Sequence, residues 1–260
     1  MISRMQEIIS YKDMIVGLVR RDLRGRYKGS FLGFLWNFVN PLFQIVIYAV
    51  VFSQIMRNNT PNYVVYLICG MMPWLFFNDS IRQGAGCIVD QADMAKKIYF
   101  PREVLPLSAV FSRFINLLIT YTLVLLYILF TGYKINVSAL IFLLPALLFI
   151  LLFALGLTLL FSSINVYFRD VEHILGIILM AWMWITPIIY EADIMKGTPV
   201  QILVYWNPLT YFIKLFQQII YEQVIPEAST LWLCFLISVI TLFIGEIIFS
   251  KLSKNFAEEL

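Results

Sequence analysis

Long apolar stretches, each followed by a short polar one, run through most of the sequence. A stretch of about 20 apolar residues is long enough to cross roughly 30 Å of hydrocarbon as an α-helix. These stretches are continuously apolar and lack the alternation that barrel strands show. We therefore predict an all-α membrane protein, a single domain over residues 1–260 with six transmembrane helices. The predicted spans are residues 31–56, 63–89, 105–130, 138–164, 174–190 and 229–250.

The segment before the first span is basic and amphipathic. In residues 11–28, apolar side chains such as Met14 and Leu18 share one face of a helical wheel, among several Lys and Arg. This pattern indicates an N-terminal amphipathic helix that lies in the membrane interface. The alternative is a basic flank that only orients the first span.

The most polar interruption separates the second and third predicted spans. Residues 90–104, which we call the island, read DQADMAKKIYFPREV, and Pro101 breaks any helix through them. A second polar loop, residues 165–173, holds the only histidine, His173. A single histidine beside acids on a loop is interpreted as a solvated residue rather than a ligand or a base.

The connection between the fifth and sixth spans, residues 191–227, is unusually apolar for a loop. Its middle, residues 200–223, is rich in aromatic side chains and is interrupted by Asn207 and Pro208. Backbone that enters the membrane without spanning it must be covered by protein or line a cavity. Two short helices that enter and return on the outer side fit best. The alternative is a long span broken at Asn207–Pro208.

A few polar residues, Arg113 among them, lie inside the predicted spans. Asn37, Asn40 and Gln44 fall on one helical stripe, which indicates either a pore-facing surface or hydrogen bonding between helices. Asp79 and Arg82 are three residues apart, a spacing that allows an ion pair. The alternative role for them is contact with an anionic substrate.

Composition and charge support a membrane protein and predict its orientation. The chain is 61% hydrophobic and 13% charged, whereas about 25% of residues are charged in ordinary soluble domains. Lys and Arg are concentrated before the first span, in the island and after the last span. The opposite loops carry only Arg57, Lys134, Lys196 and Lys214. The positive-inside rule therefore predicts that both termini and the island are cytoplasmic.

The sequence lacks the motifs of an energy source or a metal site. It contains no G-x-x-x-x-G-K-[ST] phosphate loop, and Cys69, Cys87 and Cys234 lie in apolar stretches without metal-ligand spacing. No signal peptide is predicted at the N-terminus. We expect neither an enzyme nor a metal site, but a membrane subunit that is driven by another chain.

Aromatic residues make up 16% of the chain, and several lie near the predicted outer ends of the spans. An interfacial aromatic belt explains them, and so does stacking against sugar rings. Composition does not decide between the two. The residues are Trp74, Trp182, Trp184, Tyr190, Tyr205, Trp206 and Tyr211.

Four stretches, in this order and spacing, resemble the membrane subunits of type-2 ABC exporters for polysaccharides, the family of O-antigen and teichoic acid exporters. The stretches are RRDLRGRYKGSFLGFLWNFVNPLFQ (residues 20–44), KKIYFPREVLPLSAVFSRFIN (96–116), INVYFRDVEHIL (164–175) and WNPLTYFIKLFQQIIYE (206–222). The resemblance covers nearly the whole chain.

The resemblance implies a homodimer that pairs with two copies of a separate ABC ATPase subunit. ATP and Mg would be bound by that ATPase, and no cofactor by this chain. The implied substrate is a lipid-linked polysaccharide, and no nucleic acid is expected. The implied location is the bacterial cytoplasmic (inner) membrane. The alternatives are the same architecture exporting a small drug or lipid and, least supported, a membrane scaffold without transport activity.

The resemblance also implies roles for individual segments. Residues 11–28 would rest on the ATPase, the island would be the coupling loop, residues 165–173 a second contact, and residues 200–223 the outer gate helices. ATPase coupling is assigned to Asp93, Lys96, Lys97, Tyr99, Pro101, Arg102, Arg169 and Asp170. The substrate path is assigned to Asn37, Asn40, Gln44, Trp74, Trp182, Trp184, Tyr190 and Tyr205. The entrance for the pyrophosphate of the lipid carrier is assigned to Arg24, Arg26, Lys97 and Arg102.

Overall fold

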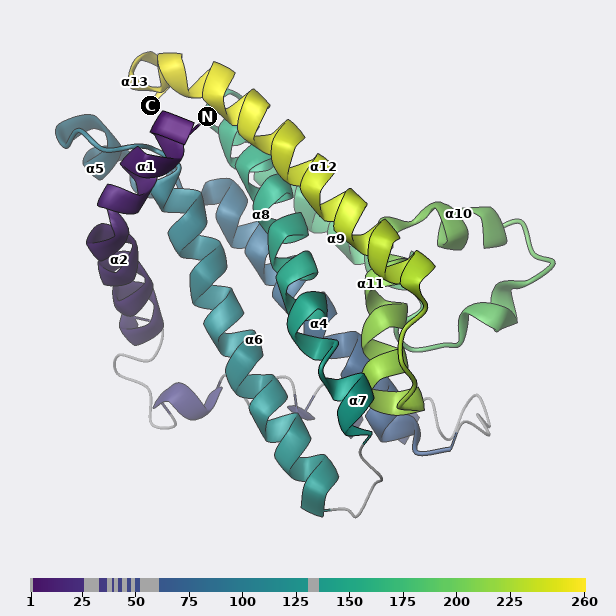
Figure 1. Ribbon diagram of the computed structural model, residues 1–260. Coiled ribbons are helices and arrows are strands. Elements are labelled where there is room, and N and C mark those ends of the chain that lie inside the picture. The colour runs from purple at the N-terminus through teal and green to yellow at the C-terminus, as the bar shows by residue number, and fades with distance from the viewer. Residues whose placement is uncertain are drawn as a thin grey trace.

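The structure is a computed structural model in which the described residues form helices joined by short connections, without β-strands (Figure 1). This confirms the prediction of an all-α protein. The residues that the structure describes are 2–25, 33–36, 39, 42–43, 46–47, 50–51, 61–130 and 136–260. The first predicted span, residues 31–56, lies largely outside the described residues, so the count of six spans stays a prediction.

Four helical stretches are long and apolar enough to cross a membrane, among the described residues. They correspond to the second, third, fourth and sixth predicted spans. They comprise α4 (Tyr63–Gly86), α6 (Val104–Phe130), the short α7 (Val137–Leu140) with α8 (Leu143–Tyr167), and α12 (Ala228–Leu252) with its short extension. The fifth predicted span corresponds to the shorter apolar helix α9 (Val171–Ile185).

Burial separates the long helices into central and peripheral ones. In the apolar part of α4, 78% of the residues are buried, whereas in α12 only 17% are. The exposed side chains of α12 are large and apolar, for example Trp232, Leu236 and Phe243. A helix that exposes such residues suits a lipid environment, where an apolar surface carries no penalty. We therefore place α4 at the centre of the bundle and α12 at its edge.

Small residues allow the long helices to approach closely. A Cβ atom added to Gly245 of α12 would lie 2.1 Å from the carbonyl oxygen of Gly156 in α8. A Cβ atom added to Gly84 of α4 would lie 2.2 Å from the Cγ2 atom of Thr158 in α8. Close backbone contact at small residues is the usual way in which membrane helices pack, because lipid provides no hydrophobic drive for association.

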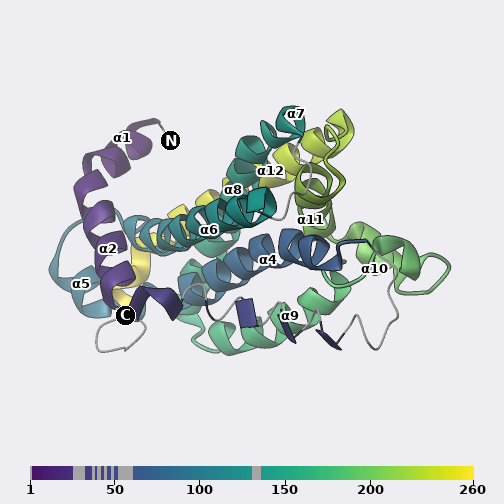
Figure 2. The same cartoon turned by 90° about the horizontal axis from the view of Figure 1, so that it is seen from below.

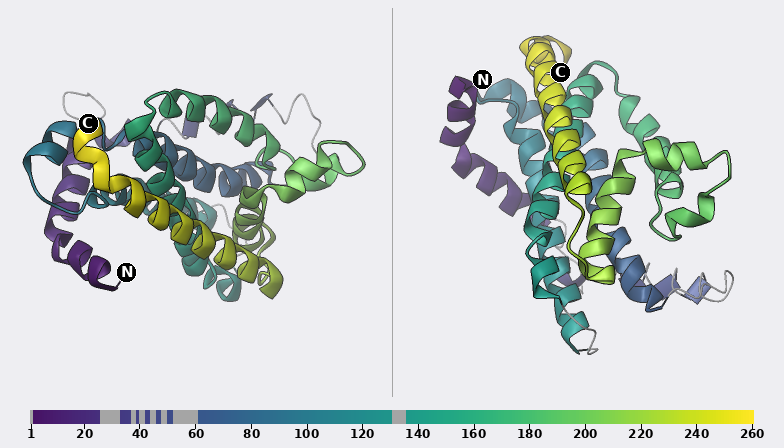
Figure 3. Two further views of the ribbon diagram at one scale, coloured as in Figure 1. Left: turned by 90° about the horizontal axis from the view of Figure 1, so that it is seen from above. Right: turned by 45° about the vertical axis from the view of Figure 1, so that its right-hand side comes forward.

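Both termini lie at one end of the bundle, which we call the terminal end (Figures 1 and 3). The helices at this end are α1 (Ile2–Ser10), α2 (Lys12–Gly25), α5 (Ala92–Lys97) and α13 (Phe256–Glu259). Helix α2 packs obliquely on the first half of α6 and buries Leu18 and Val19 (Figure 2). The island follows α4 after a short turn and includes α5.

The other end of the bundle carries the connection between α9 and α12. Residues 186–190 form no helix, and they lead to η2 (Ala192–Met195), α10 (Gln201–Trp206), α11 (Pro208–Phe216) and the π-helix η3 (Gln217–Glu222). The Asn207 side chain accepts a hydrogen bond from the Leu209 backbone N–H at 3.0 Å and so caps α11. Residues 200–223 are thus a pair of short helices broken at Asn207, which we call the hairpin.

Candidate functional site

The island is held by one buried aromatic side chain and has an exposed tip, which consists of residues 98 and 99. Phe100 is 1% exposed and packs in a cluster with residues such as Leu105 and Phe249, whereas the neighbouring Ile98 and Tyr99 are 54% and 79% exposed. Arg102 donates a hydrogen bond from Nη2 to the carbonyl oxygen of Ala95 at 3.1 Å, which closes the loop after α5. The island is therefore held by an apolar side chain while its apolar tip faces outward.

The charged residues of the island are mostly at its surface. Lys97 and Asp93 form an ion pair of 3.7 Å across one turn of α5, and both side chains are largely exposed. Exposed pairs of this kind contribute little to stability. Lys96 is exposed as well, whereas Pro101 and Arg102 are half-buried. These charges remain accessible to another molecule.

The second polar loop also exposes an apolar side chain. Phe168 is 69% exposed, beside the exposed Arg169 and Asp170. His173 is exposed too, but it lies in the first turn of α9, because α8 and α9 extend into the predicted loop of residues 165–173 and leave only residues 168–170 between them. The Tyr167 hydroxyl donates a hydrogen bond to the carbonyl oxygen of Leu252 at 2.9 Å, which joins the ends of α8 and α12. The terminal end thus carries two polar loops, each with exposed apolar residues.

Three long-range contacts join α2 and the residue before it, Tyr11, to their surroundings, and sequence reasoning did not find them. The Tyr11 hydroxyl donates to the carbonyl oxygen of Tyr99 at 3.4 Å. Arg21 donates to the Oε1 atom of Gln91, and Ser112 of α6 donates to the Asp22 carboxylate. These contacts bring residues 70 to 90 positions apart together, so only the tertiary structure reveals them. Through them α2 is attached to the island and to α6.

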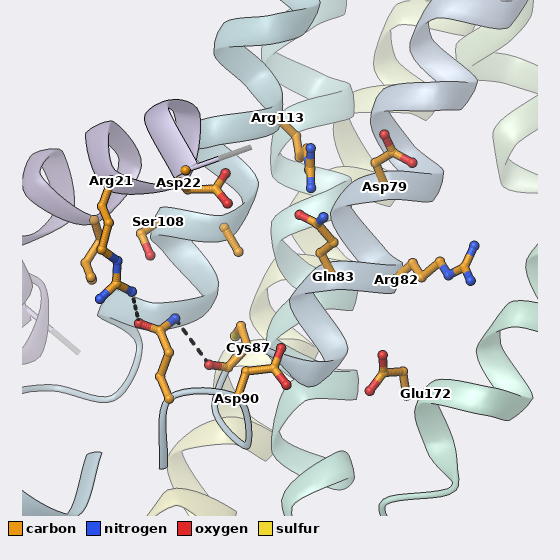
Figure 4. A pocket seen from close by; sticks show the side chains of 14 residues that line it. Arg21, Asp22, Asp79, Arg82, Gln83, Cys87, Asp90, Ser108, Arg113 and Glu172 are labelled. Carbon is orange, nitrogen blue, oxygen red and sulfur yellow. Dashed lines mark hydrogen bonds between the residues drawn. The ribbon is translucent and has the colours of Figure 1, made fainter. Parts of the chain in front are cut away.

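A polar cavity of about 780 Å³ lies between α2, α4 and α6, and Glu172 of α9 also lines it (Figure 4). The backbone carbonyl of Cys87 in its wall accepts a hydrogen bond from the Nε2 atom of Gln91 at 3.4 Å. The carboxylates of Glu172 and Asp90 both approach Gly86, where a Cβ atom would meet them at 3.0 and 3.3 Å. The sequence signal for this cavity was the set of charged residues inside apolar spans, Asp79, Arg82 and Arg113.

At the other end, buried hydrogen bonds fix the start of the hairpin. Trp182 donates from its indole Nε1 to the Oδ1 atom of Asn207 at 2.7 Å, and Asn207 donates from Nδ2 to the Oγ1 atom of Thr186 at 2.8 Å. Gln217 donates from Nε2 to the carbonyl oxygen of Pro187 at 3.3 Å. Residues far apart in the hairpin are therefore connected to the segment that follows α9.

Two tyrosines of α4 bind the non-helical segment that follows α9, residues 186–190. The hydroxyls of Tyr63 and Tyr66 donate to the carbonyl oxygens of Ile189 and Tyr190 at 2.8 and 2.7 Å. In the exposed loop beyond, Lys196 forms an ion pair of 2.8 Å with Asp193, and the hydrogen bond to that carboxylate raises the pKa of Lys196. The non-helical backbone after α9 thus obtains its partners from α4 and the hairpin.

Residues 15–221 match the family model described as ABC-2 type transporter. The chain belongs to this family. The O-antigen export system permease protein RfbA of Myxococcus xanthus is 34% identical over 262 residues, which are 100% of each chain. RfbA of Klebsiella pneumoniae is 31% identical over 95% of each chain, and the polysialic acid transport protein KpsM of Escherichia coli is 24% identical over 90% of this chain and 91% of its own.

In this ABC-2 transporter chain the predicted substrate-path residues have different surroundings. Trp74 is 3% exposed and packs against Phe77, and Trp182 is half-buried with its indole N–H bonded to Asn207. Trp184 and Tyr205 are 56% and 39% exposed. Tyr190 is buried and donates to the carbonyl oxygen of Trp184 at 2.9 Å. Asn37, Asn40 and Gln44 lie outside the described residues.

The predicted pyrophosphate entrance combines residues from two places. Arg24 is exposed on the last turn of α2, and Lys97 and Arg102 belong to the island. Within the described chain no hydrogen bond or ion pair joins Arg24 to the island. Arg26 lies outside the described residues. The described residues also include no group of three His, Cys, Asp or Glu side chains placed to hold a metal ion.

Proposed function

We propose that this chain is the permease subunit of an ATP-driven exporter that moves a lipid-linked cell-surface polysaccharide across the cytoplasmic (inner) membrane of a bacterium. The observation that carries the proposal is the similarity over nearly the whole chain to proteins whose names specify O-antigen export or polysialic acid transport. The absence of a phosphate-loop motif from the sequence agrees with it, because ATP hydrolysis then belongs to a separate ATPase subunit.

The terminal end is the ATPase side in this proposal, and both termini are cytoplasmic. The distribution of Lys and Arg supports this orientation. Exposed apolar side chains on charged loops outside the membrane are typical of a protein interface. Ile98 and Tyr99 on the island and Phe168 on the second loop have this character. Around them lie the charged residues that we assign to coupling, Asp93, Lys96, Lys97, Arg102, Arg169 and Asp170.

The attachments of the island explain how a force on its tip reaches the membrane helices. Phe100 anchors the island beside the start of α6. Tyr99 is hydrogen-bonded to Tyr11, the residue before α2, and Gln91 to Arg21 of α2. A displacement of the tip by the ATPase therefore moves α2 and the ends of α4 and α6 together. Packed elements of this kind shift between discrete arrangements rather than deforming continuously.

The remaining features of the proposal concern the whole assembly. The chain has six spans, with the first in residues 31–56, and two copies pair with two ATPase subunits. The hairpin enters the membrane from the outer side and returns, and its network of buried hydrogen bonds supports this because non-spanning backbone needs protein partners. Trp184 and Tyr205, which keep exposed ring surface, are the residues of the hairpin region that we assign to the sugar path.

Deletion of the gene for this chain tests the proposal. We expect surface polysaccharide to be lost while lipid-linked glycan accumulates inside the cell, measured by surface labelling and lipid extraction. The tagged chain should co-purify with an ABC ATPase as an assembly with two copies of each. Unchanged surface polysaccharide together with increased sensitivity to a lipophilic drug would instead support the export of a small drug or lipid.

A further inference from the structure

The cavity between α2, α4 and α6 holds a buried cation whose hydrogen bonds are incomplete. Arg113 lies in the first half of the apolar helix α6 and is only 7% exposed. Its Nε atom is buried, and no described residue accepts a hydrogen bond from it. A guanidinium inside a membrane span is costly unless it faces a partner or a water-filled space. The Arg113 side chain extends from α6 toward Gln83 and Asp79 of α4, which line the same cavity (Figure 4).

The lining of the cavity is polar, and its positive and negative groups nearly balance, so it does not select an ion of one sign. It includes three guanidinium groups and four carboxylates, together with the carboxamides of Gln83 and Gln91 and the hydroxyl of Ser108. A bound phosphate would lie among four carboxylates, and a bound cation among three guanidinium groups. Like charges brought together in this way oppose binding. The lining therefore disfavours a small ion of either sign.

A ligand rich in hydroxyl groups can form hydrogen bonds with both the cationic and the anionic groups of such a lining. Each hydroxyl donates one hydrogen bond and accepts others, so it bonds to a carboxylate and to a guanidinium or amide at the same time. Hydrogen bonds to charged groups are stronger than those between neutral groups. The volume of about 780 Å³ lies within the range of small-molecule sites. The chemistry and the size both fit sugar units.

The cavity also shares a wall with the proposed coupling apparatus. Arg21 and Asp22 of α2 line it, and these residues are hydrogen-bonded to Gln91 of the island and to Ser112 of α6. A displacement of the island therefore changes the wall of the cavity. A site at this position can be open to a ligand in one arrangement of α2 and reshaped in another.

We infer that this cavity is a binding site for uncharged, hydroxyl-rich sugar units of the transported glycan, held between α2, α4 and α6 at the cytoplasmic side. This rests on the proposed function and deepens it. Arg113 and Gln83 are the central contacts, and Arg21 contributes from α2. The site differs from the predicted pyrophosphate entrance at Arg24, Arg26, Lys97 and Arg102.

Binding of lipid-free glycan to the purified complex of this chain with its ATPase, in nanodiscs and without ATP, tests the inference. The probe is the host's own surface polysaccharide, released from its lipid by mild acid and cut to short fragments, and binding is measured by equilibrium dialysis. We expect an excess of inorganic pyrophosphate not to displace the fragments. We expect Arg113→Gln to weaken binding by about tenfold, as for the loss of one charge-assisted hydrogen bond.

Two further variants separate binding from misfolding of an Arg113 variant. Gln83→Ala and Arg21→Gln should each weaken binding, while the complex keeps its elution volume and melting temperature. Arg20→Gln is the matched control, because Arg20 is the exposed neighbour of Arg21 on α2 and does not line the cavity. Binding by this control should equal that of the wild type.

The outcomes distinguish the inference from the proposed function. If the wild type binds the fragments and all three cavity variants bind equally well, the site is wrong although glycan export stands. If the fragments are displaced by pyrophosphate, or only pyrophosphate binds, the cavity takes the anionic headgroup and the inference is wrong. If deletion of the gene leaves surface glycan unchanged, the proposed function itself fails.

Discussion

The island and the hairpin are both interruptions between membrane helices, but they are held in different ways. The hairpin and the segment before it are connected by buried hydrogen bonds from Trp182, Asn207 and Gln217. The island has one buried aromatic anchor, Phe100, while its tip is exposed. A buried polar network favours a single geometry. An exposed tip suits a surface that a partner moves, so the hairpin is the more rigid of the two regions, and the island fits the coupling role that we propose for it.

Substitutions in the island and the hairpin test this difference, and they differ in the expected loss of folding free energy. Phe100→Ala should have the largest effect, about 3–5 kcal/mol, because it leaves a cavity in the cluster beneath the island. Tyr99→Ala at the exposed neighbouring position should change stability by no more than about 0.5 kcal/mol. Thermal unfolding of the two detergent-purified variants checks both values. Equal stability of the two variants would contradict the role of Phe100 as the anchor.

Asn207→Ala should have the next largest effect and act at the hairpin. It removes the acceptor of the Trp182 indole N–H and the cap of α11, and each buried group left unpaired costs about 1–3 kcal/mol. Trp182 fluorescence should also shift as its surroundings change. Asn255→Ala, at an exposed position near the C-terminus, serves as the control. A melting temperature unchanged from the wild type would show that the network does not stabilise the hairpin.

Tyr66→Phe should have a smaller effect, about 1 kcal/mol, because it removes one hydroxyl that bonds to the carbonyl oxygen of Tyr190. Tyr205→Phe is the matched control, since the Tyr205 hydroxyl makes no hydrogen bond to the described residues. Limited proteolysis of the loop after Tyr190 should be faster in Tyr66→Phe only. The same proteolysis rate in both variants would mean that this bond does not hold the segment.

Lys96→Glu combined with Lys97→Glu should have the smallest effect on stability, because both side chains are exposed and exposed charges contribute little. Export of surface polysaccharide should nevertheless be lost while the complex with the ATPase still assembles, measured by surface labelling and co-purification. The control is Lys251→Glu combined with Lys254→Glu, two exposed residues at the same end. Normal export by the island variant would contradict its role in coupling.

Sequence reasoning succeeded where local chemistry decides the structure. The helical class follows from apolar stretches that satisfy their own backbone hydrogen bonds. The break in residues 200–223 follows from Asn207 and Pro208, because asparagine caps a helix and proline is suited to its first turn. The island was visible because charges and Pro101 interrupt an apolar pattern.

Sequence reasoning was incomplete where contacts join distant parts of the chain. Trp182 was predicted to lie in the sugar path, and its indole N–H is bonded to Asn207, 25 positions away. Arg113 was seen only as a charge inside a span, whereas the structure places it beside Gln83 and Asp79 in one cavity. The spacing of apolar residues along the sequence predicts neither arrangement, because each depends on how the helices are rotated about their axes.

The sequence by itself determined that this protein is helical, that it belongs in a membrane, and where its chain is interrupted, because these properties depend on neighbouring residues and on solvation by lipid. Only the tertiary structure decided which face of each helix is buried. It attached α2 to the island through Arg21 and Gln91, and it enclosed Arg113 in a polar cavity. The physical reason is that helix packing at small residues such as Gly156 and Gly245 sets the rotation of each helix, and that rotation selects which polar side chains meet.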